Sequence, residues 1–409
     1  MEDMTSTRSH FRECLGGDVF ILQCMGLYSM GAIFKDDKPQ WHYWETIPFI
    51  IGLGTITVAV IFDIRNVYDT AQTDFMMSIE VAAAVFTVAL AVFKGYRLWF
   101  HRKELYNLLT VCHRRWNILS SRNHLREDSI GIARNTRLFR ICYTVAVVGT
   151  VGSYNLRPYV LYLKFHLAQT NDSFDFSETV YPAHYPFTLN TPIQYFLLTT
   201  WENCGLYFLD LWWIAADCLF AQLTTHFAIQ FNVLSGEIRR IEITPTSTPL
   251  GIKKIIRQLK RIIREHVELL SYVHAVEEWY NPIIFATILL NGLNLCTCLY
   301  SLQYRLARNN WRDAVKNTTH ATTIALQTFL FCSYAQRLND EINGFRQAIY
   351  ECSWVNFNMA TKTMILVLMI HTEREYVYSA YGFFNVNMPQ VTVIFSTAMR
   401  FFTLLRSVS

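Results

Sequence analysis

The last apolar stretch of the chain carries a stripe of less apolar side chains. The stripe consists of Thr392, Ser396, Met399 and Thr403. These positions advance by four, three and four residues, so a helix places them on one face. Polar groups inside a membrane helix face protein or water. The stripe predicts either a helix–helix seam, where Ser and Thr are common, or the wall of a pore. In a pore, Met399 or Phe402 would form a hydrophobic constriction that gates by dewetting.

Carboxylates also stand in or beside apolar segments, at Glu80, Glu202, Asp210 and Asp217. An ionisable group inside a membrane is a functional candidate by default, because burying its charge is costly. Asp210 lies deepest in its segment. A buried ion pair or a structural hydrogen bond is the favoured interpretation of these groups, ahead of ligand contact.

Enzyme chemistry finds no support in the motifs. The sequence has no G-x-S-x-G, no H-E-x-x-H and no phosphate-binding glycine loop. Its histidines show no metal-like grouping, and the single C-x-C at Cys296 and Cys298 lacks a second ligand pair. The net charge of +4 is too small to suggest a nucleic-acid partner. We therefore expect neither an enzyme nor a protein with a metal or cofactor.

The composition is that of a membrane protein. Of 409 residues, 52% are hydrophobic and only 17% are charged, against about 25% charged in soluble proteins. Apolar runs long enough to cross a bilayer recur along the chain. Seven spans are expected, at Thr46–Phe62, Met76–Phe93, Leu138–Tyr162, Thr191–Leu223, Pro282–Leu302, Thr319–Tyr334 and Val386–Leu405. The fourth exceeds one bilayer crossing, so part of that helix should project beyond the membrane.

The loops indicate an orientation. Lysines and arginines gather at residues 94–140 and 239–264, and the opposite loops hold few. Because basic loops stay in the cytoplasm, the N-terminus is expected inside and, after seven spans, the C-terminus outside. The two glycosylation sequons, at Asn171 and Asn317, then fall in outer loops. This topology is the inverse of that of a G-protein-coupled receptor.

The segment before the last span contains "TMILVLMI" at residues 363–370. Eight residues are too few for a helix to cross a bilayer. The loop after the fourth span also has the apolar spacing of an amphipathic helix. The two segments together predict a helical cytoplasmic region that joins subunits.

Three C-terminal stretches resemble the insect odorant receptors. They are "AIYECSWVNF", "ATKTMILVLM" and "FFNVNMPQVTVIFSTAMRFFTLLRS", in this order at the end of the chain. Seven spans, the inverted topology and the chain length extend the resemblance to the whole protein. One departure is Met399-Arg400, where the family often has Tyr-Ser.

The resemblance implies an all-α tetrameric channel at the plasma membrane of olfactory neuron dendrites. Odorant would gate a non-selective cation current, and the chain would be the ligand-tuned subunit that joins a shared co-receptor. It implies three regions: residues 1–335 with six spans and the ligand pocket, 336–385 as a cytoplasmic anchor, and 386–409 as the pore-lining helix. Anchor positions would be Tyr350, Trp354, Leu366 and Leu368.

A volatile odorant is small and mostly apolar, so its site should be a concave cavity with aromatic walls and few polar groups. The outer halves of spans two, three, four and six offer small residues for room and aromatic residues for walls. The candidates are Ala82, Val85, Phe86, Gly149, Gly152, Ser153, Tyr154, Trp201, Cys204, Gly205, Phe208, Trp212, Thr322, Thr323 and Leu326. Ordinary helix packing is the competing explanation for each. A gustatory receptor channel and a metabotropic seven-helix receptor remain alternatives.

Overall fold

The computed structural model describes residues 15–35, 38–70, 75–121, 127–168, 174, 176, 179–180, 185, 187–241 and 249–408. Almost all of this part of the chain is helical. An N-terminal helix, Leu15–Cys24, is followed by short 3-10 helices at Tyr28–Lys35 and Tyr43–Glu45. The longer helices are α2 (Thr46–Thr70), α3 (Phe75–Phe100), α4 (Arg102–Ser121), α5 (Glu127–Ala168), α6 (Pro192–Arg239), α7 (Pro249–Ala307), α8 (Trp311–Glu351), α9 (Met359–His371) and α10 (Met388–Val408).

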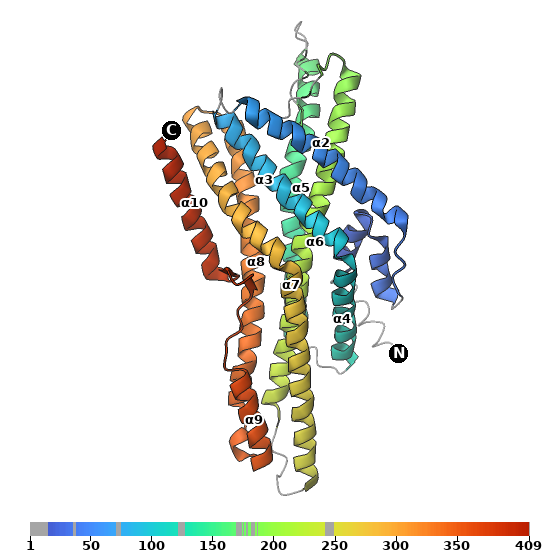
Figure 1. The fold of residues 1–409 in the computed structure, drawn as a ribbon, viewed down its shortest axis with the longest axis vertical. Coiled ribbons are helices and arrows are strands. Elements are labelled where there is room, and N and C mark those ends of the chain that lie inside the picture. The colour runs from blue at the N-terminus through green and yellow to red at the C-terminus, as the bar shows by residue number, and fades with distance from the viewer. Residues whose placement is uncertain are drawn as a thin grey trace.

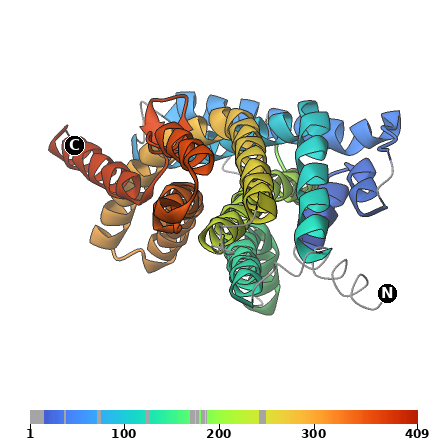
Figure 2. The ribbon, with the colours of Figure 1, turned by 90° about the horizontal axis from the view of Figure 1, so that it is seen from below.

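Four long helices dominate the molecule. The longest, α7, has 59 residues, and α6, α5 and α8 have 48, 42 and 41. At about 1.5 Å per residue, α6 alone is about 72 Å long, against a hydrocarbon core of about 30 Å. Figure 1 shows these helices along the long axis, with α2, α3 and α10 against the upper part only. Seen along that axis, α10 lies at one edge of the bundle and the N-terminal helix at the opposite edge (Figure 2).

The upper part of the bundle presents apolar side chains outwards. Along α2, Ile47, Ile50 and Ile61 are more than half exposed. On α5, Val145 and Leu163 are exposed as well. Such a surface suits lipid rather than water, because large exposed apolar patches are rare on soluble monomers.

By length and hydropathy, four helices of the described residues could cross a membrane: α2, α3, α6 and α7. The remaining spans expected from the sequence lie on α5, α8 and α10, which are also helical. On α8 the polarity comes from side chains such as His320, Thr323 and Gln327 on its inner side. Inward polar groups lower mean hydropathy without exposing charge to lipid.

Two sequence boundaries fall inside continuous helices. α8 runs from Trp311 to Glu351 without interruption, so the expected start of the anchor region at residue 336 lies within it. The amphipathic stretch after span four and span five itself form one helix, α7, which continues through Pro282. Proline lacks a backbone N–H, which usually ends or kinks a helix. α7 nevertheless continues past the proline, and it packs against α3, α6 and α8.

The linker between α9 and α10 is hydrogen-bonded to α7 and positions the start of α10. Strands β1 (Ser379–Ala380) and β2 (Phe384–Asn385) pair in an antiparallel hairpin. The Glu277 carboxylate of α7 accepts hydrogen bonds from the Ser379 backbone N–H at 3.0 Å and the Tyr376 hydroxyl at 2.9 Å. Burial, and then the Glu277 carboxylate, raise the pKa of Tyr376, so its hydroxyl keeps the proton that it donates. The lower end of α10 is therefore tied to α7.

Helices α3 and α6 approach closely at a glycine. A Cβ atom on Gly95 would lie 2.4 Å from the Trp212 Cδ2 atom, and Trp212 is fully buried. We expect Gly95→Ala to separate the two helices and to destabilise the protein by about 1–3 kcal/mol, the usual cost of overpacking. Thermal unfolding of the purified protein measures the loss. The matched control is Gly149→Ala, where nothing lies within 4 Å of the added carbon. Equal melting temperatures for the two variants would contradict the expectation.

Candidate functional site

A cavity of about 480 Å³ lies between α3, α5, α6, α7 and α8. One wall comes from α3, which contributes small and branched residues every three or four positions, including Val81, Ala84, Val88 and Ala91. These share one face because the α-helix repeats every 3.6 residues. Trp213 of α6 adds an aromatic surface. The volume and the apolar lining are those of a small-molecule site.

Four polar groups of the cavity are bonded to one another in two pairs. The Thr87 Oγ1 atom lies 3.3 Å from the His320 Nε2 atom, which joins α3 to α8. The hydroxyls of Thr150 and Thr323 are 3.0 Å apart and join α5 to α8. These contacts connect the walls of the cavity.

The lining of the cavity includes the cations Lys316 and Arg157. The Lys316 ammonium lies 4.7 Å from the centre of the Tyr154 ring, within the range of a cation–π contact. Asp210 of α6 lines the same cavity. The site therefore combines apolar walls with a small number of charged groups.

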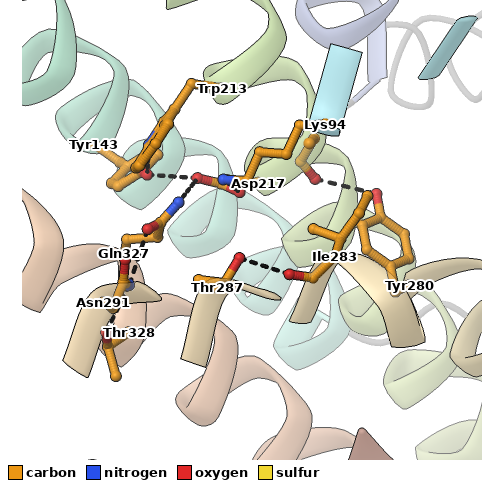
Figure 3. A network of polar contacts seen from close by, with 11 residues as sticks. Lys94, Tyr143, Trp213, Asp217, Tyr280, Ile283, Thr287, Asn291, Gln327 and Thr328 are labelled. Atoms are coloured by element: carbon orange, nitrogen blue, oxygen red, sulfur yellow. Dashed lines mark hydrogen bonds and ion pairs between the residues drawn. The ribbon is translucent and has the colours of Figure 1, made fainter. Parts of the chain in front are cut away.

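A buried polar network adjoins the cavity (Figure 3). At its centre, the Lys94 ammonium lies 2.6 Å from the Asp217 Oδ1 atom, and both side chains are 0% exposed. The other carboxylate oxygen of Asp217 accepts hydrogen bonds at 2.7 Å from the Tyr143 hydroxyl and from the Gln327 amide. Asn291 extends the network by donating to Gln327 at 3.0 Å. One carboxylate thus connects α3, α5, α6 and α8, and α7 through Asn291.

Trp213 belongs to both the cavity and the network. Its indole N–H donates to the Tyr143 hydroxyl at 2.9 Å, and the Lys94 ammonium lies 4.1 Å from the centre of one of its rings. Its other surface lines the cavity. The network therefore fixes the position of an aromatic wall of the cavity, because moving the indole would disturb both contacts.

Two of the fifteen candidate ligand residues line the cavity, and the other thirteen do not. Tyr154 and Thr323 line the cavity. The others lie on the same helices but outside the lining: Ala82, Val85, Phe86, Gly149, Gly152, Ser153, Trp201, Cys204, Gly205, Phe208, Trp212, Thr322 and Leu326. Of these, Phe208 packs against Gly52 of α2, and Trp212 packs beside Gly95 of α3.

The lining residues missed from the sequence mostly neighbour the candidates. On α6 the lining uses Leu206, Leu209 and Trp213 rather than Gly205, Phe208 and Trp212. One residue corresponds to about 100° around a helix, so the candidates face α2 and α3 instead. The polar residues Lys316 and His320, one helical turn apart near the start of α8, were a signal that sequence reasoning did not use.

The stripe on α10 points away from the rest of the chain. Thr392, Ser396, Met399 and Thr403 are all exposed, and Phe402 is half-buried. The buried face of α10 is formed by Ile394 and Ala398, and its neighbours are α7 and α8. The stripe is therefore not a seam within the described part of this subunit. Arg400 is also exposed.

The four anchor candidates differ in how exposed their side chains are. Tyr350 is 71% exposed and Leu366 is 46% exposed, whereas Leu368 is 4% exposed. Trp354 is half-buried and packs against the core. The first two are available to another chain, and Leu368 stabilises its own subunit.

The structure describes one of the two sequon asparagines. Asn171 lies outside the described residues. Asn317 is in α8, is 9% exposed and lines the cavity. A glycan is bulky and needs solvent, so attachment at Asn317 would require its side chain to leave the cavity.

Comparison with known proteins assigns the family. A family model described as "7tm Odorant receptor" matches residues 74–399. The chain belongs to this odorant receptor family. Odorant receptor 94a of Drosophila melanogaster is 21% identical over 95% of this chain and 96% of that receptor. Odorant receptor 13a of the same fly is 24% identical over 47% of this chain and 49% of that receptor.

Two solved structures of the insect olfactory receptor OR5 from Machilis hrabei share the fold of this odorant receptor chain. Their TM-scores are 0.69 and 0.75, each at 14% identity and covering 98% of this chain and 100% of OR5. The second is a complex with eugenol. The membrane-helical fold expected from the sequence is thus confirmed, and the resemblance to insect odorant receptors is confirmed by the family match.

Proposed function

We propose that this odorant receptor is the ligand-tuned subunit of an odorant-gated, non-selective cation channel that it forms with a shared co-receptor. The observation that carries the proposal is the cavity of about 480 Å³ among five helices of a chain in this family. A small apolar odorant fits a concave site with these walls. We place the ligand in this cavity, with Tyr154 and Thr323 as contacts from the original candidates.

The route from ligand to pore runs through α7 and α8. Both helices line the cavity and both pack against α10. A ligand that binds more tightly when α7 and α8 are displaced favours that conformation of the protein. Because α10 packs against both helices, it would shift with them. The exposed stripe on α10 supports its assignment as the pore wall, with Met399 or Phe402 as the constriction.

The proposed arrangement in the membrane has seven spans, a cytoplasmic N-terminus and an extracellular C-terminus. The distribution of lysine and arginine supports it. Residues 336–385 would form the cytoplasmic anchor of a tetramer, including Tyr350 and Leu366. The site of action would be the plasma membrane of olfactory neuron dendrites.

The test of the site is a cavity-filling substitution in channels co-expressed with a co-receptor. Ala84 lines the cavity, and its neighbour Ala82 on α3 does not. Once a screen of volatile compounds finds an agonist, Ala84→Phe should raise its half-maximal concentration by about tenfold or more, equal to about 1.4 kcal/mol. The control is Ala82→Phe, for which we expect a smaller change. A larger effect at Ala82 would move the site to another face of α3.

Current that needs no cytoplasmic component distinguishes this channel from a metabotropic receptor. We expect agonist-evoked current in excised patches without added nucleotide, whereas a metabotropic receptor needs cytoplasmic components. An extracellular N-terminal tag would likewise contradict the channel topology. A gustatory receptor channel would give the same current, and activation by volatile compounds distinguishes the olfactory assignment.

A further inference from the structure

We propose that Asp210 is the polar contact for the ligand in the cavity and selects compounds whose head group donates a hydrogen bond. The class consists of small alcohols, phenols and protonated amines with a mostly apolar body. This inference rests on the proposed ligand-binding function. It concerns a group of this chain that the packing of the protein itself does not employ.

Asp210 differs from the other charged and polar groups around it. His320, Thr150 and Thr323 contact one another or neighbouring helices. Lys316 stacks on Tyr154. Asp210 lines the cavity, yet it has neither a hydrogen bond nor an ion pair with any described residue.

An unpartnered carboxyl group in an apolar cavity is an expensive feature of a membrane protein. The nearby Asp217, seven residues further along α6, shows how this fold satisfies a structural carboxylate. It receives a lysine, a tyrosine hydroxyl and an amide. Asp210 receives none of these, so a bound molecule is the partner that its position allows.

The chemistry of the carboxyl group defines the ligand class. Its carbonyl oxygen accepts a hydrogen bond in both protonation states. An O–H or N–H donor is therefore matched whether or not Asp210 is ionised. A compound that offers only an acceptor, such as an ether, is matched only by the protonated form and leaves an ionised form unpaired.

The surroundings of Asp210 set the orientation of such a ligand. Trp213, one helical turn further along α6, lines the same cavity and gives the apolar body a flat surface. Val81, Ala84 and Val88 of α3 also contribute apolar lining. The cations Lys316 and Arg157 belong to the same lining. The head group would contact Asp210 while the body rests against Trp213.

The experiment compares matched pairs of compounds. The probes are hexanol, octanol and phenethyl alcohol, the methyl ether of each, and phenethylamine. Two readouts are used: current from the receptor co-expressed with a co-receptor, and ligand-induced thermal stabilisation of the purified receptor. At least one alcohol should act at a concentration about tenfold below that of its ether, since the site pairs with the donor.

Two variants at the same position separate charge from hydrogen bonding. Asp210→Asn keeps an acceptor and adds N–H donors, so we expect it to keep the response to alcohols, to respond better to the ethers and to lose about tenfold or more in sensitivity to the amine. Asp210→Leu should abolish the alcohol preference while keeping the response to the ethers. Asp340→Leu, a carboxylate exposed on α8, is the control and should change neither.

The outcomes distinguish this inference from the proposed function. Stabilisation by alcohols without any current in the presence of a co-receptor would overturn the channel function and leave the Asp210 assignment standing. Current or stabilisation that persists with an unchanged alcohol preference in Asp210→Leu would overturn the assignment alone. Failure of every alcohol and of the amine to stabilise the wild-type receptor would overturn it as well.

Discussion

Neutralising either partner of the Lys94–Asp217 pair is expected to remove most of the folded receptor from the membrane, and neutralising both is expected to recover much of it. Each single variant, Lys94→Gln or Asp217→Asn, leaves one charge buried without its counterion. Breaking a buried pair on one side costs about 3–5 kcal/mol. Much of the stability of an ordinary domain, about 5–15 kcal/mol, would be lost.

The recovery follows from the geometry of the pair. With Lys94→Gln and Asp217→Asn together neither position carries a charge, and the new amides can bond across the 2.6 Å contact that the ion pair now makes. An oxygen at residue 217 still accepts from Tyr143 or Gln327. Replacing both partners of a buried pair is therefore much less costly than replacing one.

Surface biotinylation and the melting temperature of the purified receptor measure the effect as a double-mutant cycle. Lys254→Gln, at an exposed lysine of α7, is the control and should leave both quantities unchanged. Additive losses in the double variant would show that the two residues do not act as a pair. Because Trp213 contacts both Lys94 and Tyr143, surviving single variants should also respond less to agonist.

Local sequence patterns were sufficient to locate the helices but not to orient them. Apolar runs of about 20 residues mark the parts of α2, α3, α5, α6, α7, α8 and α10 that were expected as spans, because the bilayer sets the length of such a run. They do not show how far α5, α6, α7 and α8 extend beyond it. On α6, however, aromatic residues occur on adjacent faces, at Phe208 and Trp212 and at Trp213. Which face lines a cavity depends on the glycines of α2 and α3 that receive Phe208 and Trp212. Those partners are more than 100 residues away in the sequence, so local spacing carries no information on them.

The roles of the charged residues could not be predicted from local sequence either. Both Asp210 and Asp217 could be identified from the sequence as costly groups in an apolar segment. Their different environments could not, because the lysine that neutralises Asp217 comes from α3, 123 residues earlier. The carboxylate with a partner is structural, and the one without a partner faces the cavity. Only the tertiary contacts separate the two roles.

The lower end of the molecule carries the second large expected effect. On α9, Leu366 is 46% exposed, Val367 is 57% exposed and Ile370 is 70% exposed. Ile365 and Leu368, on the other side of the helix, are buried within the subunit. A contiguous apolar surface of this kind marks a protein interface. In the proposed tetramer it would be covered by neighbouring subunits.

The double substitution Leu366→Asp and Ile370→Asp is expected to abolish assembly and agonist-evoked current while leaving the fold of the single subunit intact. Both side chains are accessible in the subunit, so the new carboxylates remain hydrated there, but an interface would bury them without partners. Light scattering after size exclusion measures the assembly, and circular dichroism measures the helix content. Lys253→Asp, at an exposed position of α7, is the control for added negative charge.

Leu368→Asp should instead reduce helix content and yield, because Leu368 is 4% exposed and packs inside the subunit. Intact tetramers from the double variant would place the interface elsewhere and leave the exposed face of α9 to the membrane surface or to another partner.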